Sequence, residues 1–383
     1  MTASPSISGN SLPGRYLALD VFRGLTIALM VVVNTPGSWN TLYAPLAHAS
    51  WHGFTLTDLV FPTFLFVVGN AMSFSMKSLN QMDPGAFFKK ITKRSAIIFL
   101  IGWGLNAFPF VGYGEEGSLQ MIDWTSVRVF GVLQRIALCY FLAAIVLYYL
   151  GKRGAAIVST LILLLYWGLM FTFGDSNDPY ALASNAALKL DLWLLPAKNL
   201  YRGEGIPFDP EGLLSTLPAM VNVIGGYIAG FYLQRKGNSP TSVRVLLVAS
   251  LILITVALIW NPAFPINKKI WTSSYVLLTI GLDCLILALL VLIIEIWRLK
   301  NWTYPLEVFG RNPLVLYMLS GMIIKIFYMI RIGNESLKSI IYEAFYASWL
   351  SPKNASFFYA LSYMMLIWAI GYWMDRKKIY IKV

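Results

Sequence analysis

Charged residues are scarce in this chain. Lys, Arg, Asp and Glu make up 13% of the 383 residues, hydrophobic residues make up 57%, and the mean hydropathy is +0.64. A soluble protein carries about twice that share of charge, because charged side chains cover its surface. The scarcity excludes the soluble, disordered and fibrous classes and indicates an integral membrane protein.

Cysteine is also scarce, and the common nucleotide and hydrolase motifs are missing. The two cysteines, Cys139 and Cys284, lie inside apolar runs, which excludes a disulfide framework and a cysteine-based zinc site. No Walker motif, GxGxxG or GxSxG elbow stands out. The net charge of +12 would suggest nucleic acid in a soluble protein, but in a membrane protein the placement of charge matters more than its sum.

What the sequence does contain is a series of apolar runs, each about 20 residues long, which is the length of a membrane-spanning helix. They predict an all-α, polytopic membrane helix bundle with about ten transmembrane helices. The expected spans are 19–34, 58–76, 90–108, 127–150, 154–173, 213–234, 242–260, 273–297, 305–330 and 356–374.

The basic residues indicate how the chain is oriented. Lys and Arg concentrate in alternate loops, and the loop 35–57 has none. The positive-inside rule therefore predicts that both termini are cytoplasmic. We expect a single transmembrane domain over 1–383, with a disordered tail at 1–14 and an external loop at 174–212. Because the excess positive charge then forms a cytoplasmic rim beside the lipid bilayer, we expect no nucleic-acid partner.

A few ionisable residues fall inside the expected spans, where they are costly and point to function. Asp20 and Arg23 share a helix face and can pair, either as a structural ion pair or as support for a site. Arg135 follows Gln134 and has no acidic neighbour one turn away. Such an arginine favours a ligand phosphate or a carboxylate from another helix, with simple packing as the alternative.

Both histidines of the chain lie in the external loop that has no Lys or Arg. His48 and His52 are four residues apart, and Asp58 follows. Histidine suits proton transfer near neutral pH, so we expect general acid–base chemistry. A metal is less favoured because Asp58 is the only local third ligand, and interfacial hydrogen bonding is the remaining alternative.

Two further external clusters lie near the membrane. Asp209 and Glu211 precede the sixth span, where acids can cap a helix or hold an amine or sugar hydroxyls. Lys268 and Lys269 interrupt the low charge of the outer face, and either stay solvated or meet an anion.

The order of several motifs resembles a known family. LALDVFRGLTIALMVVVNTPG and HASWHGFTLTDLVFPTFLFVVGNAMSFSM are followed by GVLQRIALCY, FDPEGLLSTLPA, INKKIWTSSYVLLT and PLEVFGRNPLVLYMLS. This series is similar to the heparan-α-glucosaminide N-acetyltransferase family, whose bacterial branch contains NagX-type proteins. It covers nearly the whole chain. The chain differs at His52, where an asparagine is expected, in a longer interval from Asn34 to His48, and in lacking a large lumenal extension.

The resemblance implies a membrane acyltransferase that moves an acetyl group from cytoplasmic acetyl-CoA to the amine of glucosamine or a related amino sugar. It implies that His48 is catalytic, with Asn34 as its active-site partner. It also implies a bacterial inner-membrane protein that forms a homodimer.

From these indications we expect the following site. His48 acts as general base, and Asn34 orients it or stabilises the oxyanion. The acceptor is held by Asp58, Asp209, Glu211 and His52. The acetyl-CoA is held by Arg135, Gln134, Arg128 and Asn312, and no metal is needed. The alternatives are a sugar O-acyltransferase and a transporter or flippase of sugar-like substrates, although we find no internal repeat of broken helices.

Overall fold

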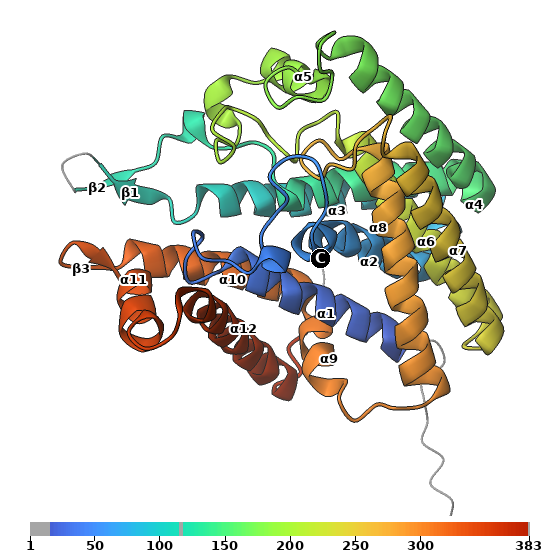
Figure 1. The fold of residues 1–383 in the computed structure, drawn as a ribbon. Helices are drawn as coiled ribbons and strands as arrows, with labels where there is room; N and C mark the ends of the chain where they lie inside the picture. The colour runs from blue at the N-terminus through green and yellow to red at the C-terminus, as the bar shows by residue number, and fades with distance from the viewer. Residues whose placement is uncertain (1–15, 115–117, 382–383) are drawn as a thin grey trace, which may run out of the picture.

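The computed structural model describes residues 16–114 and 118–381, and these are mostly helical (Figure 1). The expected tail at 1–14 lies outside the described residues. The helices are α1 (Leu17–Asn34), α2 (Leu56–Leu79), α3 (Pro84–Ala107), α4 (Val132–Phe173), α5 (Ala186–Leu194), α6 (Thr216–Lys236), α7 (Pro240–Trp260), α8 (Ser273–Leu290), α9 (Tyr304–Arg311), α10 (Pro313–Met329), α11 (Leu337–Tyr342) and α12 (Pro352–Arg376).

Short elements complete the described chain. Two antiparallel hairpins form, β1 (Val111–Tyr113) with β2 (Leu119–Met121) and β3 (Arg331–Ile332) with β4 (Glu335–Ser336). Single 3₁₀ turns are η1 (Ala44–Leu46), η2 (Trp124–Ser126) and η3 (Ala197–Asn199), and π turns extend α8 over Val291–Ile296 and α11 over Glu343–Ala347. The expected external loop 174–212 is therefore ordered around α5 and η3.

Seven helices in the described part are long and apolar enough to cross a membrane: α1, α2, α4, α6, α7, α12, and α8 with its extension. The pair α9 and α10 is bent by 85° at a short break, and it adds an eighth span if the two helices together form one. The expected span 305–330 is therefore not one straight helix. Helix α4 has 42 residues and is interrupted at Gly151, where φ is 59°. It includes residues 132–150 of the expected span 127–150 and all of the expected span 154–173. The remaining expected span corresponds to α3, whose apolar stretch also carries Lys90, Lys93 and Arg94. The count of ten and the cytoplasmic termini stay predictions.

Helices α2 and α6 pack closely against each other. A Cβ atom added to Gly69 would lie 1.9 Å from the carbonyl oxygen of Val223, and one added to Gly226 would lie 1.9 Å from that of Phe66. Small residues allow two helix backbones to approach in this way, which is how membrane helices often pack. The contact fixes α2, whose first turn carries Asp58.

Three loops meet at one end of the bundle, where the loop after α1 rises toward the loops that flank α5 and precede α8 (Figure 1). Gly53 N–H donates to the carbonyl of Ile266 at 2.8 Å. The indole of Trp51 donates to the carbonyl of Tyr180 at 3.0 Å. The loop between α1 and α2 carries His48 and His52 and is called the histidine loop. These contacts hold it against segments that lie more than a hundred residues further along the chain.

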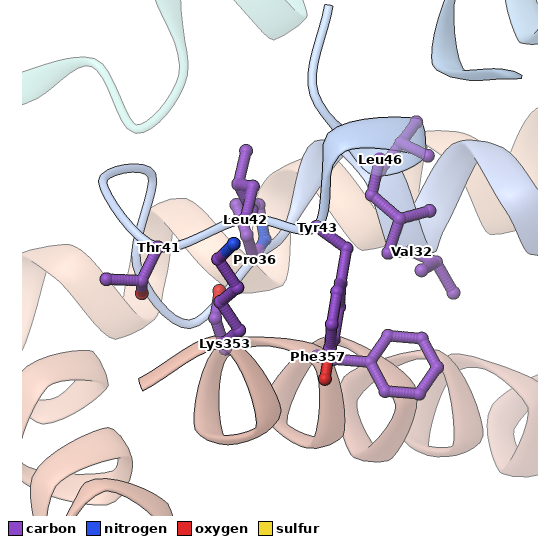
Figure 2. A pocket seen from close by; sticks show the side chains of 11 residues that line it. Val32, Pro36, Thr41, Leu42, Tyr43, Leu46, Lys353 and Phe357 are labelled. Carbon is purple, nitrogen blue, oxygen red and sulfur yellow. The ribbon is translucent and has the colours of Figure 1, made fainter. Parts of the chain in front are cut away.

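The first half of the histidine loop is anchored on α12. Ser38 N–H donates to Ser356 Oγ at 3.0 Å, and the rings of Tyr43 and Phe357 meet edge to face with centroids 6.2 Å apart (Figure 2). The crevice between them offers about 10 Å³, roughly the space of one water molecule. It is too small for a sugar, so we interpret it as a packing feature.

Candidate active site

His48 and Asp58 form the centre of the site. His48 Nδ1 lies 2.7 Å from Asp58 Oδ1, and the Asp58 side chain is 1% exposed whereas that of His48 is 38% exposed. A carboxylate only accepts hydrogen bonds, so Nδ1 is the donor, and in the neutral ring the lone pair lies on Nε2. The imidazole therefore presents a basic nitrogen whose orientation is set by a buried acid.

The second oxygen of Asp58 fixes the carboxylate in place. Oδ2 accepts from the backbone N–H of Ala49 at 3.1 Å and of Thr55 at 3.0 Å. Thr55 and Asp58 form a capping box that begins α2. One residue thus starts the helix and orients His48, because the loop turns directly into α2.

Lys268 approaches the same imidazole from the loop before α8. Its Nζ lies 3.1 Å from His48 Nδ1 and 3.3 Å from Nε2, and 3.8 Å from Asp58 Oδ1. The neighbouring Lys269 instead pairs with Glu204 and donates to the carbonyl of Ser50 at 2.7 Å. The sequence singled out both lysines by their isolated charge, but it did not reveal that one of them reaches His48, 220 residues away.

A cavity of about 240 Å³ opens beside these groups. Four of the expected site residues line it, namely Asn34, His48, Arg128 and Glu211. The other lining residues are Met30, Val33, Thr57, Val60, Phe61, Val132, Tyr201, Glu204, Pro210, Lys268 and Lys269. A mixed apolar and polar cavity of this kind is the usual form of a small-molecule site. Tyr201 and Glu204 were not predicted, and nothing in their local sequence marks them.

Arg128, Asp209 and Glu211 form one ionic cluster at the cavity wall. Arg128 binds Asp209 through two hydrogen bonds, Nε to Oδ2 at 2.9 Å and Nη2 to Oδ1 at 2.7 Å, and its Nη2 lies 2.5 Å from Glu211 Oε2. Tyr201 stacks on the guanidinium, 4.7 Å from its ring centroid. Burial alone lowers the pKa of Arg128, but the two carboxylates outweigh it and the pKa is raised. These acids therefore act by binding Arg128 rather than by capping α6.

Arg135 is buried deeper in the bundle. Its Nη2 donates to the carbonyl of Gly212 at 3.0 Å and to Ser215 Oγ, and its guanidinium stacks on Trp271 at 4.9 Å. Within residues 16–114 and 118–381, its Nε and Nη1 have no hydrogen-bond partner. Gln134 is likewise buried. Neither residue is among the described residues that line the cavity.

Four further expected residues lie outside the described lining of the cavity. Asn312 sits at the α9–α10 bend, where its side chain donates to the carbonyl of Ile379 at 2.9 Å. Asp20 and Arg23 form their ion pair at 3.4 Å. His52 Nδ1 lies 3.3 Å from Asn267 Nδ2. In the described part of the chain no group of three His, Cys, Asp or Glu gathers to hold a metal.

The buried Asp191, on α5, makes the stability of the protein depend on pH. Its carboxylate is buried and accepts from Leu213 N–H at 3.0 Å. Burial raises its pKa from 3.8 to about 7. The folded protein therefore keeps this proton over a range where the unfolded chain has lost it, so stability falls as pH rises from about 4 to about 7 and then levels off.

We expect Asp191→Asn to remove this part of the pH dependence. The measurement is the apparent melting temperature of wild type and variant in detergent at pH 5 and at pH 8. The difference between the two pH values should be larger in the wild type, which is relatively more stable at pH 5. An equal pH dependence in both proteins would contradict the assignment.

Comparisons with known proteins agree on one family. Residues 15–195 match the family model of the heparan-alpha-glucosaminide N-acetyltransferase catalytic region. The chain is 28% identical to the Homo sapiens heparan-alpha-glucosaminide N-acetyltransferase over 435 aligned residues, which cover 98% of this chain and 61% of that protein. It is 27% identical to the Mus musculus protein of the same name over 369 aligned residues, covering 80% of this chain and 53% of that protein.

The chain thus spans a little over half the length of these curated relatives. The region matched by the family model includes Asn34, His48, Asp58 and Arg128, whereas Lys268 lies beyond it. The comparisons confirm the resemblance indicated by the sequence motifs: this chain is similar to heparan-alpha-glucosaminide N-acetyltransferases along nearly its whole length.

Proposed function

We propose that this protein is a membrane N-acetyltransferase that moves an acetyl group from acetyl-CoA to the amine of glucosamine or a related amino sugar. The observation that carries the proposal is the His48–Asp58 pair, 2.7 Å apart, at the wall of a cavity large enough for a small ligand. The names of the relatives support the reaction and the acceptor class.

His48 acts as general base in the proposed reaction. The acceptor amine attacks the thioester carbonyl, a C–N bond forms, and the amine proton moves to His48 Nε2. The C–S bond then breaks and CoA leaves as its thiolate. Asp58 holds the ring and stabilises the imidazolium, and Asn34 orients the reactants or donates to the developing oxyanion.

The cavity wall offers groups for an amino sugar. Glu211 is a carboxylate at the cavity, 13% exposed, and can attract an ammonium or accept from hydroxyls. Asp209 supports it through Arg128, and His52 extends the acceptor site from the loop. A buried carboxylate tied to an arginine is rigid, which favours one orientation of the sugar.

Acetyl-CoA is the proposed donor and enters as a substrate. The observation that fits it is the buried guanidinium of Arg135, whose Nε and Nη1 have no partner among the described residues and could bind phosphate or pantetheine oxygens. Gln134, Arg128 and Asn312 complete the proposed donor residues. A bacterial inner-membrane location, cytoplasmic termini and a homodimer are part of the same proposal.

The test is an acetyl-transfer assay of the purified full-length protein in detergent with radiolabelled acetyl-CoA. We expect acetylation of glucosamine and none of N-acetylglucosamine, which lacks the free amine, or of glucose, which has a hydroxyl there. Acetylated glucose would favour an O-acyltransferase. Absence of acetyl transfer to every amino sugar would overturn the proposal, and sugar uptake by proteoliposomes without acetylation would indicate a transporter.

The same assay distinguishes direct transfer from a covalent intermediate. Wild-type protein and His48→Ala are incubated with radiolabelled acetyl-CoA without acceptor and then quenched. Label retained on the wild type and absent from the variant would indicate an acetyl-histidine.

A further inference from the structure

Lys268 is placed unlike any ordinary surface lysine. Its Nζ lies within hydrogen-bonding distance of both ring nitrogens of His48, at 3.1 and 3.3 Å. Its side chain is 17% exposed and lines the cavity. The carboxylate within 4 Å of Nζ is Asp58, whose Oδ1 is already bonded to His48.

The neighbouring Lys269, in the same loop, forms an ordinary ion pair with Glu204. Lys269 Nζ contacts Glu204 and the carbonyl of Ser50, so its charge is matched by a carboxylate of its own. Lys268 has no such dedicated acid in the described chain, and its Nζ is directed at the general base. Lys269 therefore links neighbouring loops, whereas Lys268 lies beside His48.

The environment of Lys268 also favours release of its proton. Burial lowers the pKa of Lys268, and the nearby charges of Asp58 and Glu211 offset this only in part. A lysine with a lowered pKa lies nearer to an ordinary thiol, whose pKa is about 8.5. A lysine whose pKa is close to that of the thiol is better suited to exchange a proton with it.

We propose that Lys268 is a second catalytic residue, which protonates the departing CoA thiolate and then recovers its proton from His48. This inference rests on the proposed function and deepens it. The 3.3 Å separation between Nε2 and Nζ permits direct transfer without an intervening water.

The proton balance closes without any further reactant. The neutral acceptor amine loses a proton to His48 Nε2 as the C–N bond forms. The ammonium of Lys268 gives a proton to the thiolate as the C–S bond breaks, so CoA leaves as the thiol. His48 then returns its extra proton to the Lys268 amine, and both groups are ready for the next turnover.

The proposed proton relay runs from His48 to Lys268 and on to the CoA thiolate. Experiments can distinguish it from a role in which Lys268 only supplies positive charge. An arginine in place of Lys268 would keep a positive charge beside the thiolate, but its pKa above 12 prevents it from giving up a proton. Lys268→Ala removes both charge and proton, together with three carbons and one nitrogen. Trimethylammonium has the same heavy atoms, can donate a proton, and cannot form an amide.

The experiment measures acetylglucosamine formed by purified full-length wild type, Lys268→Ala, Lys268→Arg and Lys198→Ala. Lys198 is the control because it is an exposed lysine on the outer loops that contacts Thr125. We expect kcat to fall about 10²-fold to 10³-fold in both Lys268 variants, and to stay at the wild-type value in Lys198→Ala. Added trimethylammonium should raise kcat of Lys268→Ala about tenfold or more, with saturation, and should not affect Lys268→Arg.

The possible outcomes separate the role of Lys268 from the acetyltransferase function itself. Near wild-type activity of Lys268→Arg, or a Lys268→Ala enzyme that is well folded but not rescued, would overturn the relay while the acetyltransferase function stands. Should Lys268→Ala fail to fold, judged by its elution profile in size-exclusion chromatography, Lys268→Arg alone decides between charge and proton transfer. A wild-type protein that acetylates no amino sugar would overturn both.

Discussion

Replacing His48 with alanine is expected to lower kcat for acetyl transfer about 10⁴-fold. The variant loses the nitrogen that receives the amine proton, and no other described histidine lies near Asp58. His52, the second histidine of the chain, contacts Asn267 instead. We therefore expect His52→Ala to raise KM for the amino sugar while kcat changes only a few-fold, about threefold at most.

Asp58→Asn tests the same pair from the other side. The amide keeps the size of the side chain but no longer fixes Nδ1 as the donor, so we expect kcat to fall on the order of 10³-fold or more. Because the two residues act as a unit, the double variant should be about as slow as His48→Ala alone. The measurement is steady-state kinetics at saturating acetyl-CoA. Additive losses, or an active His48→Ala enzyme, would contradict the assignment of His48 as the base.

The His48–Asp58 pair could be predicted from the sequence because its geometry is local. Ten residues separate the two, and the loop between them leads directly into the first turn of α2. The contact of Lys268 with His48 joins segments 220 residues apart. Nothing in either segment specifies the other, since the contact depends on how α2, α6 and α8 pack.

The spans show the same division between local and non-local information. Hydropathy predicted α1, α2, α6, α7, α8 and α12 because each is a continuous apolar helix. It did not predict the 85° bend between α9 and α10. Likewise, the sequence assigned Arg128 to the donor and Asp209 and Glu211 to the acceptor. No local signal shows that these three side chains bind one another across 81 and 83 residues.

Replacing Arg128 with methionine is expected to cause the largest loss of stability among the site residues. Asp209 has a fully buried side chain and Glu211 is 13% exposed, and both are balanced by Arg128. Without the guanidinium, two carboxylates lie close together in the cavity wall with no counter-charge. Leaving a buried charge uncompensated costs about 3–5 kcal/mol. Part of that loss is relieved here because the arginine is 25% exposed, so we expect about 3 kcal/mol.

Glu211→Gln provides the matched comparison, because it leaves the two-hydrogen-bond pair of Arg128 with Asp209 in place. It should cost less than about 1 kcal/mol, as for a partly solvated ion pair. The measurement is the apparent melting temperature of each purified variant in the same detergent, where Arg128→Met should lie about 5–10 °C below the wild type and Glu211→Gln close to it. Equal losses in the two variants would mean that Glu211, not the buried Asp209, is the principal partner of Arg128. A wild-type melting temperature in Arg128→Met would mean that the two acids take up protons when the arginine is removed, and that the cluster serves the ligand site rather than the fold.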